Sequence, residues 1–232
     1  MDRDTVYTHN PAVVATSSFF PRVYGWMTAG LGVTALAAIF TLSSPALLQA
    51  IFGNRLVFYA LIIAELGLVI GLSAAINRIS AGTAKMMFLL YSALSGVTFS
   101  AIFLVYTESS IASTFFVAAG TFGAMSLYGM VTRRDLTGWG SFLFMGLIGI
   151  IIASVVNIFL QSAMITWVVS CIGVLVFVGL TAYDTQKLKR MAAAGFADDE
   201  ARQKATILGA LTLYLDFINL FLMMLRLMGN RR

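Results

Sequence analysis

The sequence predicts an all-α polytopic membrane protein that crosses a bilayer seven times. Of its 232 residues, 59% are hydrophobic and only 11% are charged, whereas soluble domains carry roughly 25% charged residues. Apolar segments of about 20 residues, each long enough to span a hydrocarbon core of ~30 Å as a helix, recur along nearly the whole chain. The alternating pattern typical of a β-barrel is absent. We therefore expect a single transmembrane domain over residues 1–232.

Charged residues, glycine and proline bound the apolar runs and define the expected helices. The first run follows a polar tail, residues 1–21, which has no apolar signal-peptide core, so the first helix must act as the insertion signal. His9 lies in this tail and cannot supply a general base for buried chemistry. The expected spans are residues 22–43, 54–76, 84–106, 111–131, 139–160, 163–185 and 205–228.

Lysine and arginine are concentrated in alternate loops, which predicts the orientation because short cytoplasmic loops retain these residues. The loops after the second, fourth and sixth spans are basic, whereas the opposite loops hold only Arg55. We therefore expect a cytoplasmic amino terminus, and seven crossings then place residues 229–232 outside. Arg231 and Arg232 conflict with that last step, so the seventh helix either crosses fully or re-enters and returns its tail to the cytoplasm. The basic loop residues are Arg78, Lys85, Arg133, Arg134, Lys187, Lys189, Arg190, Arg202 and Lys204.

Several other classes of function have little support in the sequence. The net charge of +5 comes from short clusters between apolar runs, so we expect no nucleic-acid partner. Cys171 is the only cysteine, which excludes an intramolecular disulfide. Common hydrolase, redox and nucleotide-binding motifs are absent, so we expect neither an enzyme nor a bound cofactor. Small-residue pairs such as Gly67 and Gly71 allow helix packing within a monomer or between monomers, which leaves the oligomeric state open.

Three acidic residues lie within the expected spans, where an ionised aspartate costs at least ~2.5 kcal/mol to insert at mid-helix. Glu65 is near the middle of the second span, Asp184 ends the sixth, and Asp216 is close to the centre of the seventh. Asp216 either bonds Asn219, Tyr214 or a neighbouring helix as interhelical glue, or forms a proton- or cation-responsive site. Each acid is therefore a candidate functional residue.

Asp184 and Asp216 together would make a pH sensor, because two buried carboxylates that meet repel each other and share one proton. Measured from the cytoplasmic ends, Asp216 is about 10 Å deeper than Asp184. The seventh helix must therefore begin outside the bilayer, which the polar run 201–209 permits. Alternatively, Asp184 at the membrane edge pairs with Lys187 or Arg190.

The remaining charged residues have several interpretations. Glu65 is interhelical glue, lines a water-filled path, or pairs with Arg226, the basic residue within the seventh run. Arg78 is either a snorkelling interface residue or a gating partner of an aspartate. The clusters 133–135 and 198–200 are expected to be solvated loop charge.

Two segments resemble the most characteristic parts of the Bax inhibitor-1 family, also called the transmembrane Bax inhibitor motif family. They are GLTAYDTQKLKR, residues 179–190, and ALTLYLDFINLFLMMLRLMG, residues 210–229. The seven-span layout and the basic loop before the last span extend the resemblance over essentially the whole chain, most closely to bacterial inner-membrane members. The resemblance implies six helices surrounding a central seventh, and a place in the bacterial inner membrane.

The same resemblance implies a pH-sensitive calcium leak that opens and closes as a pair of aspartates changes protonation and hydrogen bonding. By motif, these residues correspond to Asp184 in TAYD and Asp216 in YLDFIN, while Glu65 and Arg226 match further partner residues. Arg78 matches less well, because some members carry the corresponding arginine about half a helical turn earlier.

The sequence thus predicts a pH-sensitive calcium leak in a lipid bilayer, with protons and Ca²⁺ as its small partners and Ca²⁺ as the transported ion. Asp184 and Asp216 are the expected sensor, Glu65 a secondary pathway acid, and all three are candidate transient ligands of Ca²⁺. The main alternative is a non-conducting regulator that binds a membrane protease or another channel in a stress response. A proton-coupled transporter is a third hypothesis, for which no substrate is indicated.

Overall fold

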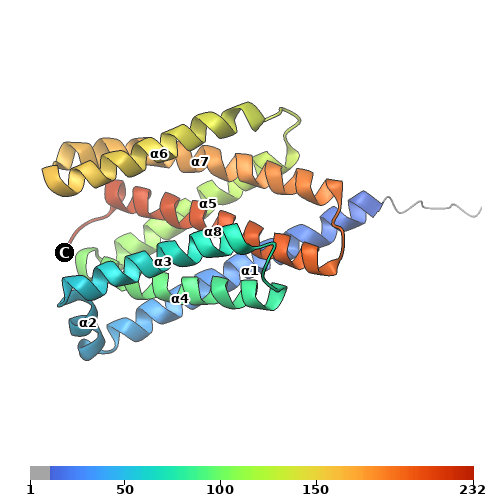
Figure 1. The fold of residues 1–232 in the computed structure, drawn as a ribbon. Helices are drawn as coiled ribbons and strands as arrows, with labels where there is room; N and C mark the ends of the chain where they lie inside the picture. The colour runs from blue at the N-terminus through green and yellow to red at the C-terminus, as the bar shows by residue number, and fades with distance from the viewer. Residues whose placement is uncertain (1–10) are drawn as a thin grey trace, which may run out of the picture.

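The computed structural model describes residues 11–232, with side chains from Ser18 onward. His9 and the first ten residues of the predicted polar tail lie outside the described part. The described chain is a bundle of α-helices without a strand (Figure 1). The helices are α1 (Pro11–Leu42), α2 (Pro45–Phe52), α3 (Arg55–Ala75), α4 (Ala81–Val105), α5 (Glu108–Val131), α6 (Thr137–Leu160), α7 (Ala163–Ala194) and α8 (Asp199–Met228).

Seven of the described helices, all except α2, are long and apolar enough to cross a membrane. The all-α membrane class predicted from composition is therefore confirmed. Three helix ends differ from the expected bounds by more than five residues. α1 begins at Pro11 and not at 22, so half of the predicted polar tail is helical, while α7 runs on to Ala194 and α8 begins at Asp199. These extra turns carry polar residues, which mark the end of an apolar run but do not end a helix.

Capping side chains set most of the helix starts. The residue before each of these helices is Ser, Thr, Asn or Asp, and its side chain accepts a hydrogen bond from a backbone N–H of the first turn, which has no partner within the helix. The short helix α2, which was not predicted, begins in this way, with Pro45 at its first position. The capping residues are Ser44, Asn54, Ser80, Thr107, Ser162 and Asp198.

Helix α8 is the most buried of the spans. Within its apolar window 72% of the residues are buried, against at most 33% in any other span. It packs against α1, α4, α5 and α7, whereas α3 packs mainly on α4, and α6 on α7. The expected ring of six helices around the seventh is thus not confirmed, since four helices line α8 and two lie outside them. The low burial of α3 and α6, 6% and 11%, agrees with their uniformly apolar surfaces, which lipid can cover.

Small residues bring the inner helices together. A Cβ atom at Gly96 on α4 would overlap the carbonyl of Thr34 on α1, and one at Gly129 on α5 would overlap that of Ala182 on α7. Gly67 on α3, by contrast, has open space where a Cβ would lie. Close packing within the monomer therefore depends on glycines of the inner helices, and Gly67 takes no part in it.

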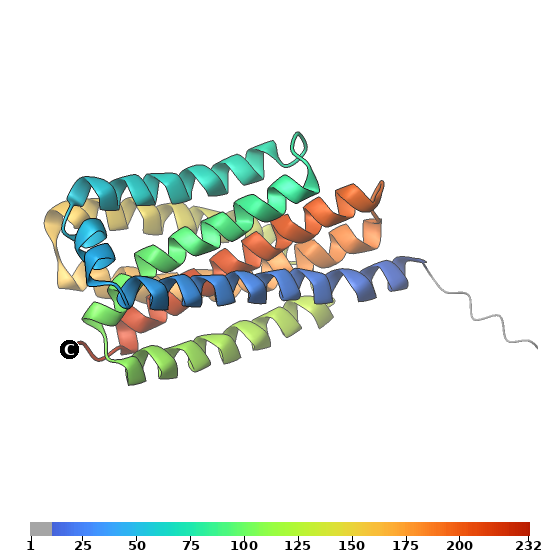
Figure 2. The same cartoon turned by 90° about the horizontal axis from the view of Figure 1, so that it is seen from below.

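The carboxyl-terminal segment shows how the two terminal arginines are accommodated. The start of α1 and the carboxyl terminus lie at opposite ends of the bundle, and α8 is one continuous helix (Figures 1 and 2). The segment after α8 then pairs with the α4–α5 connection, where the Arg232 N–H donates to the Val105 carbonyl at 3.0 Å. The Arg232 guanidinium lies 3.4 Å from the Glu108 carboxylate, and Arg231 lies over the Tyr106 ring. α8 therefore crosses the bundle without re-entry, and its terminal charges have local partners.

Candidate functional site

The structure brings Asp184 on α7 and Asp216 on α8 together in the interior of the bundle. Their carboxyl groups are within hydrogen-bonding reach of each other. Both residues are largely inaccessible, with 9% and 5% of their surfaces exposed. They line one cavity of about 500 Å³ where α6 and α7 face α8. The two sequence-predicted sensor residues thus occupy one site.

The register between α7 and α8 explains why the two aspartates meet. Gly209 on α8 lies against the Leu188 side chain on α7, where a larger residue would overlap it. Asp184 is four residues before Leu188, and Asp216 is seven residues after Gly209. Because the helices are antiparallel, Asp216 lies three residues deeper, which is about 4.5 Å at 1.5 Å per residue. This offset is smaller than the 10 Å expected from the ends of the apolar runs, and two side chains can bridge it.

The contact between the two carboxyl groups has a chemical requirement. An ionised carboxylate only accepts hydrogen bonds, so a bond between two carboxyl groups needs a proton on one of them. Oδ2 of Asp216 is fully buried and has no hydrogen-bond partner among the described residues. Loss of the shared proton would leave two like charges in a medium of low dielectric constant. A hydrogen bond between the two carboxyl groups therefore requires one shared proton.

The walls of the aspartate cavity are partly polar. Thr212 and Asn219 line it from the same face of α8 as Asp216, and Lys187, which is exposed, stands at its mouth. The Asn219 side chain donates to the Leu215 carbonyl at 2.8 Å, so it bonds the backbone of its own helix and not Asp216. Among the described residues no ion pair joins Asp184 to Lys187.

Glu65 lies in a different contact, between α3 and α4. Its carboxylate accepts hydrogen bonds from the Ser95 hydroxyl at 3.5 Å and from the Thr98 hydroxyl. Arg226 is exposed and lines another cavity, beside Asn157 on α6, so the expected ion pair with Glu65 is not formed. Of the interpretations left open for Glu65, the hydrogen bonds agree with interhelical glue.

The three acids do not form a joint calcium site. The described residues contain no group of three metal-binding side chains. The physical reason is the packing order, since α3, which carries Glu65, packs on α4 and not on the α7–α8 contact that holds the aspartates. Glu65 therefore lies apart from the two aspartates, and the role of the three acids as transient ligands of Ca²⁺ stays a prediction.

Arg78 lies exposed in the turn between α3 and α4, while Ile76 one half-turn earlier is buried. Within the described part of the chain Arg78 forms no ion pair with either aspartate. Its position agrees with an interface residue and not with a direct latch on Asp184.

Comparison with known proteins gives matches over nearly the whole chain. The family model described as "Inhibitor of apoptosis-promoting Bax1" matches residues 16–232. The chain belongs to the Bax inhibitor-1 family. The match includes both aspartates and all seven long helices, so the resemblance seen in two segments extends over nearly the whole chain.

Bacterial relatives of this Bax inhibitor-1 family member match it at nearly full length. The inner membrane protein YbhL of Escherichia coli K12 is 59% identical over 216 residues, which cover 93% of this chain and 92% of the relative. An uncharacterized protein of Borreliella burgdorferi is 46% identical over 220 residues, covering 95% of each chain. An uncharacterized membrane protein of Streptococcus pyogenes serotype M1 is 35% identical over 232 residues, covering 99% of each chain.

A polar latch just beyond Asp184 was missed from the sequence of this family member. The buried Gln186 side chain donates to the Arg134 carbonyl at 2.8 Å and accepts from the Leu136 N–H at 2.9 Å. Lys189 on the next turn donates to the Met130 carbonyl at 2.5 Å. These bonds fix α7 to the α5–α6 connection. The sequence does show that Gln186, Lys189 and Arg190 share one face of a helix. It does not show their hydrogen-bond partners, which lie about 50 residues earlier in the chain.

Arg190 completes this latch. It pairs with Asp135, so the alternative in which it pairs with Asp184 is not formed. The cluster 133–135 is exposed, as expected of solvated loop charge. Hydrogen bonds from the Thr137 side chain and backbone, together with Arg190, hold the pKa of the Asp135 carboxyl well below its usual range. In the second acidic cluster, Asp198 caps α8 by accepting from the Ala201 N–H at 2.6 Å.

Tyr214 anchors the face of α8 that points away from the aspartate cavity. Its hydroxyl lies 2.7 Å from the Thr34 hydroxyl on α1, and Thr34 in turn contacts the Ser92 carbonyl on α4 at 2.9 Å. The fully buried Tyr214 ring packs edge-on against Phe88 and Tyr91 of α4. Tyr214 therefore holds α8 to α1 and α4 and is not a partner of Asp216.

Proposed function

We propose that this protein is a pH-sensitive cation leak of the inner membrane, with Ca²⁺ as the transported ion and Asp184 and Asp216 as the gate. The single observation that carries the proposal is the contact of two buried carboxyl groups across the α7–α8 interface, within a cavity open enough to hold water. The proposal includes no chemical step and no bound cofactor.

The gate works through the one shared proton. In the protonated state the hydrogen bond between the carboxyl groups joins α7 to α8, and ions do not pass through the cavity. When the proton is lost, two like charges about 4 Å apart repel each other by ~4 kcal/mol at an effective dielectric constant of 20. Complete reversal of a two-state equilibrium needs ~5.5 kcal/mol. Repulsion of this size is therefore enough to move most molecules toward a conformation in which the helices separate.

The same deprotonation makes the cavity attractive to cations. Ca²⁺ takes six to eight oxygen ligands, and the two aspartates offer carboxylate oxygens next to the Thr212 hydroxyl and the Asn219 amide. Water would supply the remaining ligands, which suits an ion that passes and does not stay. Lys187 at the mouth offsets part of the negative charge and would limit how long the ion is held.

The orientation is part of the proposal. With the amino terminus in the cytoplasm, as the distribution of basic loops predicts, the α7–α8 connection also faces the cytoplasm. The aspartate pair lies nearer to that connection than to the opposite end of α7. The gate would therefore respond to cytoplasmic pH.

Calcium flux from proteoliposomes across a pH series tests the proposal. We expect flux that rises with pH in the wild type and loses its pH dependence in Asp216→Asn, because the amide cannot ionise. Asp135→Asn is the matched control, since this acid is exposed outside the spans and should leave the profile unchanged. Unchanged flux and pH dependence in Asp216→Asn would refute the gate.

The same experiment separates the leak from the alternative function. If the purified protein carries no flux at any pH, and crosslinking in the native membrane captures one stoichiometric partner, a non-conducting regulator of a membrane protease or channel is the better account.

A further inference from the structure

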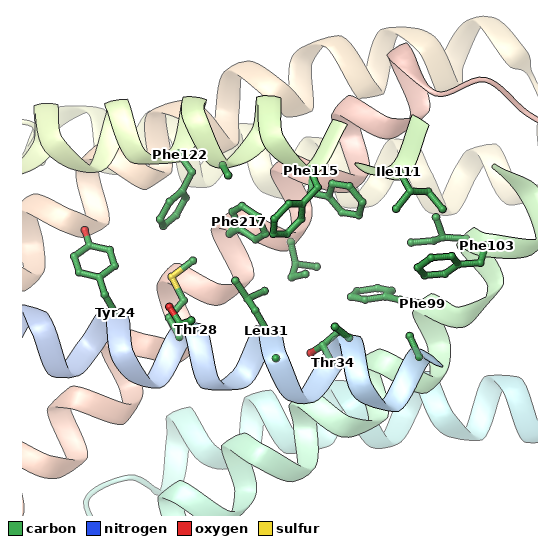
Figure 3. Close-up of a pocket in the computed structure, with 18 residues that line it drawn as sticks. Tyr24, Thr28, Leu31, Thr34, Phe99, Phe103, Ile111, Phe115, Phe122 and Phe217 are labelled. Carbon is green, nitrogen blue, oxygen red and sulfur yellow. The ribbon is translucent and has the colours of Figure 1, made fainter. Parts of the chain in front are cut away.

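A second cavity lies on the opposite side of α8 from the aspartate pair. Its volume is about 600 Å³, and it lies between α1 and α5, with α4 closing one side and α8 as its floor (Figure 3). We call it the α1–α5 groove. Its wall is made of aromatic and aliphatic side chains, including Leu31, Phe115 and Phe122, which point into the space between the two helices (Figure 3). No charged residue of the described chain lines it.

The groove and the aspartate cavity use opposite faces of one helix. At 100° per residue, Phe217 and Phe221 lie 100° and 140° around α8 from Asp216. Both phenylalanines form the floor of the groove, whereas Asp216 faces the cavity beside α6 and α7. The ligand of the groove is therefore expected to be chemically different from that of the aspartate cavity.

The position of the groove indicates hydrocarbon as its occupant. It lies within the spanning parts of α1 and α5, and it continues into surfaces that carry strongly exposed apolar side chains such as Leu36 and Phe116, with 69% and 73% exposure. In a bilayer these surfaces face acyl chains. An apolar cavity offers water few hydrogen bonds, so the neighbouring hydrocarbon is the favoured filling.

One end of the groove is polar. The Tyr24 hydroxyl lies there, points toward α5, and is buried without a hydrogen-bond partner among the described residues (Figure 3). The apolar run of α1 begins at about residue 22, so this end lies near the membrane interface, where lipid ester and phosphate oxygens are found.

The length of the groove fits a single lipid tail. Along α1 it extends from Tyr24 to Ala38, which is about 21 Å at 1.5 Å per residue. One leaflet of the hydrocarbon core is about 15 Å thick, half of ~30 Å. A lipid tail that enters beside Tyr24 and spans one leaflet is therefore short enough to lie inside the groove along its whole length.

We propose that the α1–α5 groove binds one acyl chain of a membrane phospholipid, with an ester oxygen at the Tyr24 hydroxyl. The tail then lies along Phe217 and Phe221 on the central helix. This site is independent of the proposed leak, because it requires neither conduction nor titration of the aspartates.

Photolabelling tests the site. The full chain is reconstituted with phosphatidylglycerol that carries a diazirine in one acyl chain, and labelled residues are mapped by mass spectrometry. We expect label on Phe217 or Phe221, because only a tail inside the groove reaches this face of α8. Absence of label on α8, with label spread over the exposed α3 and α6, would overturn the proposal.

Filling the groove supplies the matched comparison. Gly32 lines the groove and has open space at its Cβ position, so Gly32→Leu should lower labelling of α8 by several-fold. Gly67→Leu places the same side chain in equally open space on α3 and should leave the labelling of α8 unchanged. Helicity and elution volume check that both variants fold. Equal labelling of α8 in the two variants would contradict the site. A native mass spectrum of the wild type that shows a dimer without bound lipid would contradict it as well.

Removal of the polar contact tests the headgroup end. Tyr24→Phe removes one hydrogen bond and should lower labelling of α8 about fivefold. If Tyr24→Phe leaves labelling unchanged, the assignment of this end to the headgroup is wrong.

Discussion

The α3–α4 contact holds one half-buried acidic side chain and the α7–α8 contact holds two buried ones, and the surroundings of these acids differ. Glu65 in the first contact faces two hydroxyl donors, Ser95 and Thr98. Asp184 and Asp216 in the second face each other, and one oxygen of Asp216 has no donor among the described residues. A hydroxyl group can donate a hydrogen bond to a carboxylate that carries no proton. Two carboxyl groups, by contrast, form a hydrogen bond only while they share a proton. The partner of an acidic side chain, more than its depth, therefore determines whether its hydrogen bonds depend on a shared proton.

The position of the two contacts strengthens this difference. α3 lies at the edge of the bundle with little burial, and a change at Glu65 affects the contact of one outer helix. α8 is the most buried helix and contacts four others, so a change at Asp216 reaches α1, α4, α5 and α7. The same side-chain chemistry therefore has local consequences at the first contact and global ones at the second.

The largest effect is expected from Asp184→Asn. The amide removes one of the two charges and can donate a hydrogen bond to the Asp216 carboxylate, so the α7–α8 contact persists at every pH. Loss of a repulsion of ~4 kcal/mol corresponds to roughly a 10³-fold smaller open population at high pH. Calcium flux at a low and a high pH measures this change in the open population. A flux that still rises with pH in this variant would place the gate elsewhere.

A smaller effect is expected at Glu65. Glu65→Gln retains an oxygen that accepts from Ser95 or Thr98, so stability should change by less than about 1 kcal/mol. Glu65→Leu leaves both hydroxyls without this acceptor and should cost about 1–3 kcal/mol, seen as a lower midpoint of thermal unfolding in detergent. Both variants should retain the pH dependence of flux. Loss of that dependence in Glu65→Gln would show that the two contacts do not differ as described.

The smallest effect is expected outside the membrane, at the ion pair between Asp135 and Arg190. Because the folded protein lowers the pKa of Asp135, the ionised pair contributes stability above the unfolded pKa of about 3.9. That contribution is lost as pH falls through the lower, folded pKa. Asp135→Asn should therefore lower the unfolding midpoint slightly at neutral pH, and the difference from the wild type should vanish in strong acid. A difference that grows on acidification would contradict this assignment.

The sequence predicted the long helices well, because their signal is local. Each apolar run of about 20 residues is visible without knowledge of its neighbours, and the acids that interrupt the runs are visible in the same way. Helix α2 was missed because its eight residues, Pro45–Phe52, are too few to form a span. The outer turns of α7 and α8 were missed because they are helical but polar.

The partners of the acids could not be predicted with the same accuracy, because they depend on contacts between distant segments. The register that joins Asp184 to Asp216 follows from Gly209 against Leu188. The donors of Glu65 lie 30 and 33 residues away, among many hydroxyl residues of similar spacing. Pairing with Arg226 was one of three interpretations of Glu65 and rested on charge alone, and the packing of α3 on α4 separates the two residues.

The most direct test of the central claim is to observe the shared proton. Infrared spectroscopy of the reconstituted protein detects the carbonyl band of protonated carboxyl groups across a pH series, and Asp184→Asn and Asp216→Asn assign the part of the band that belongs to the pair. We predict one protonated carboxyl in the closed state that disappears over the same pH range in which calcium flux rises. A band that is unaffected by both variants, or that titrates outside that range, would contradict the account.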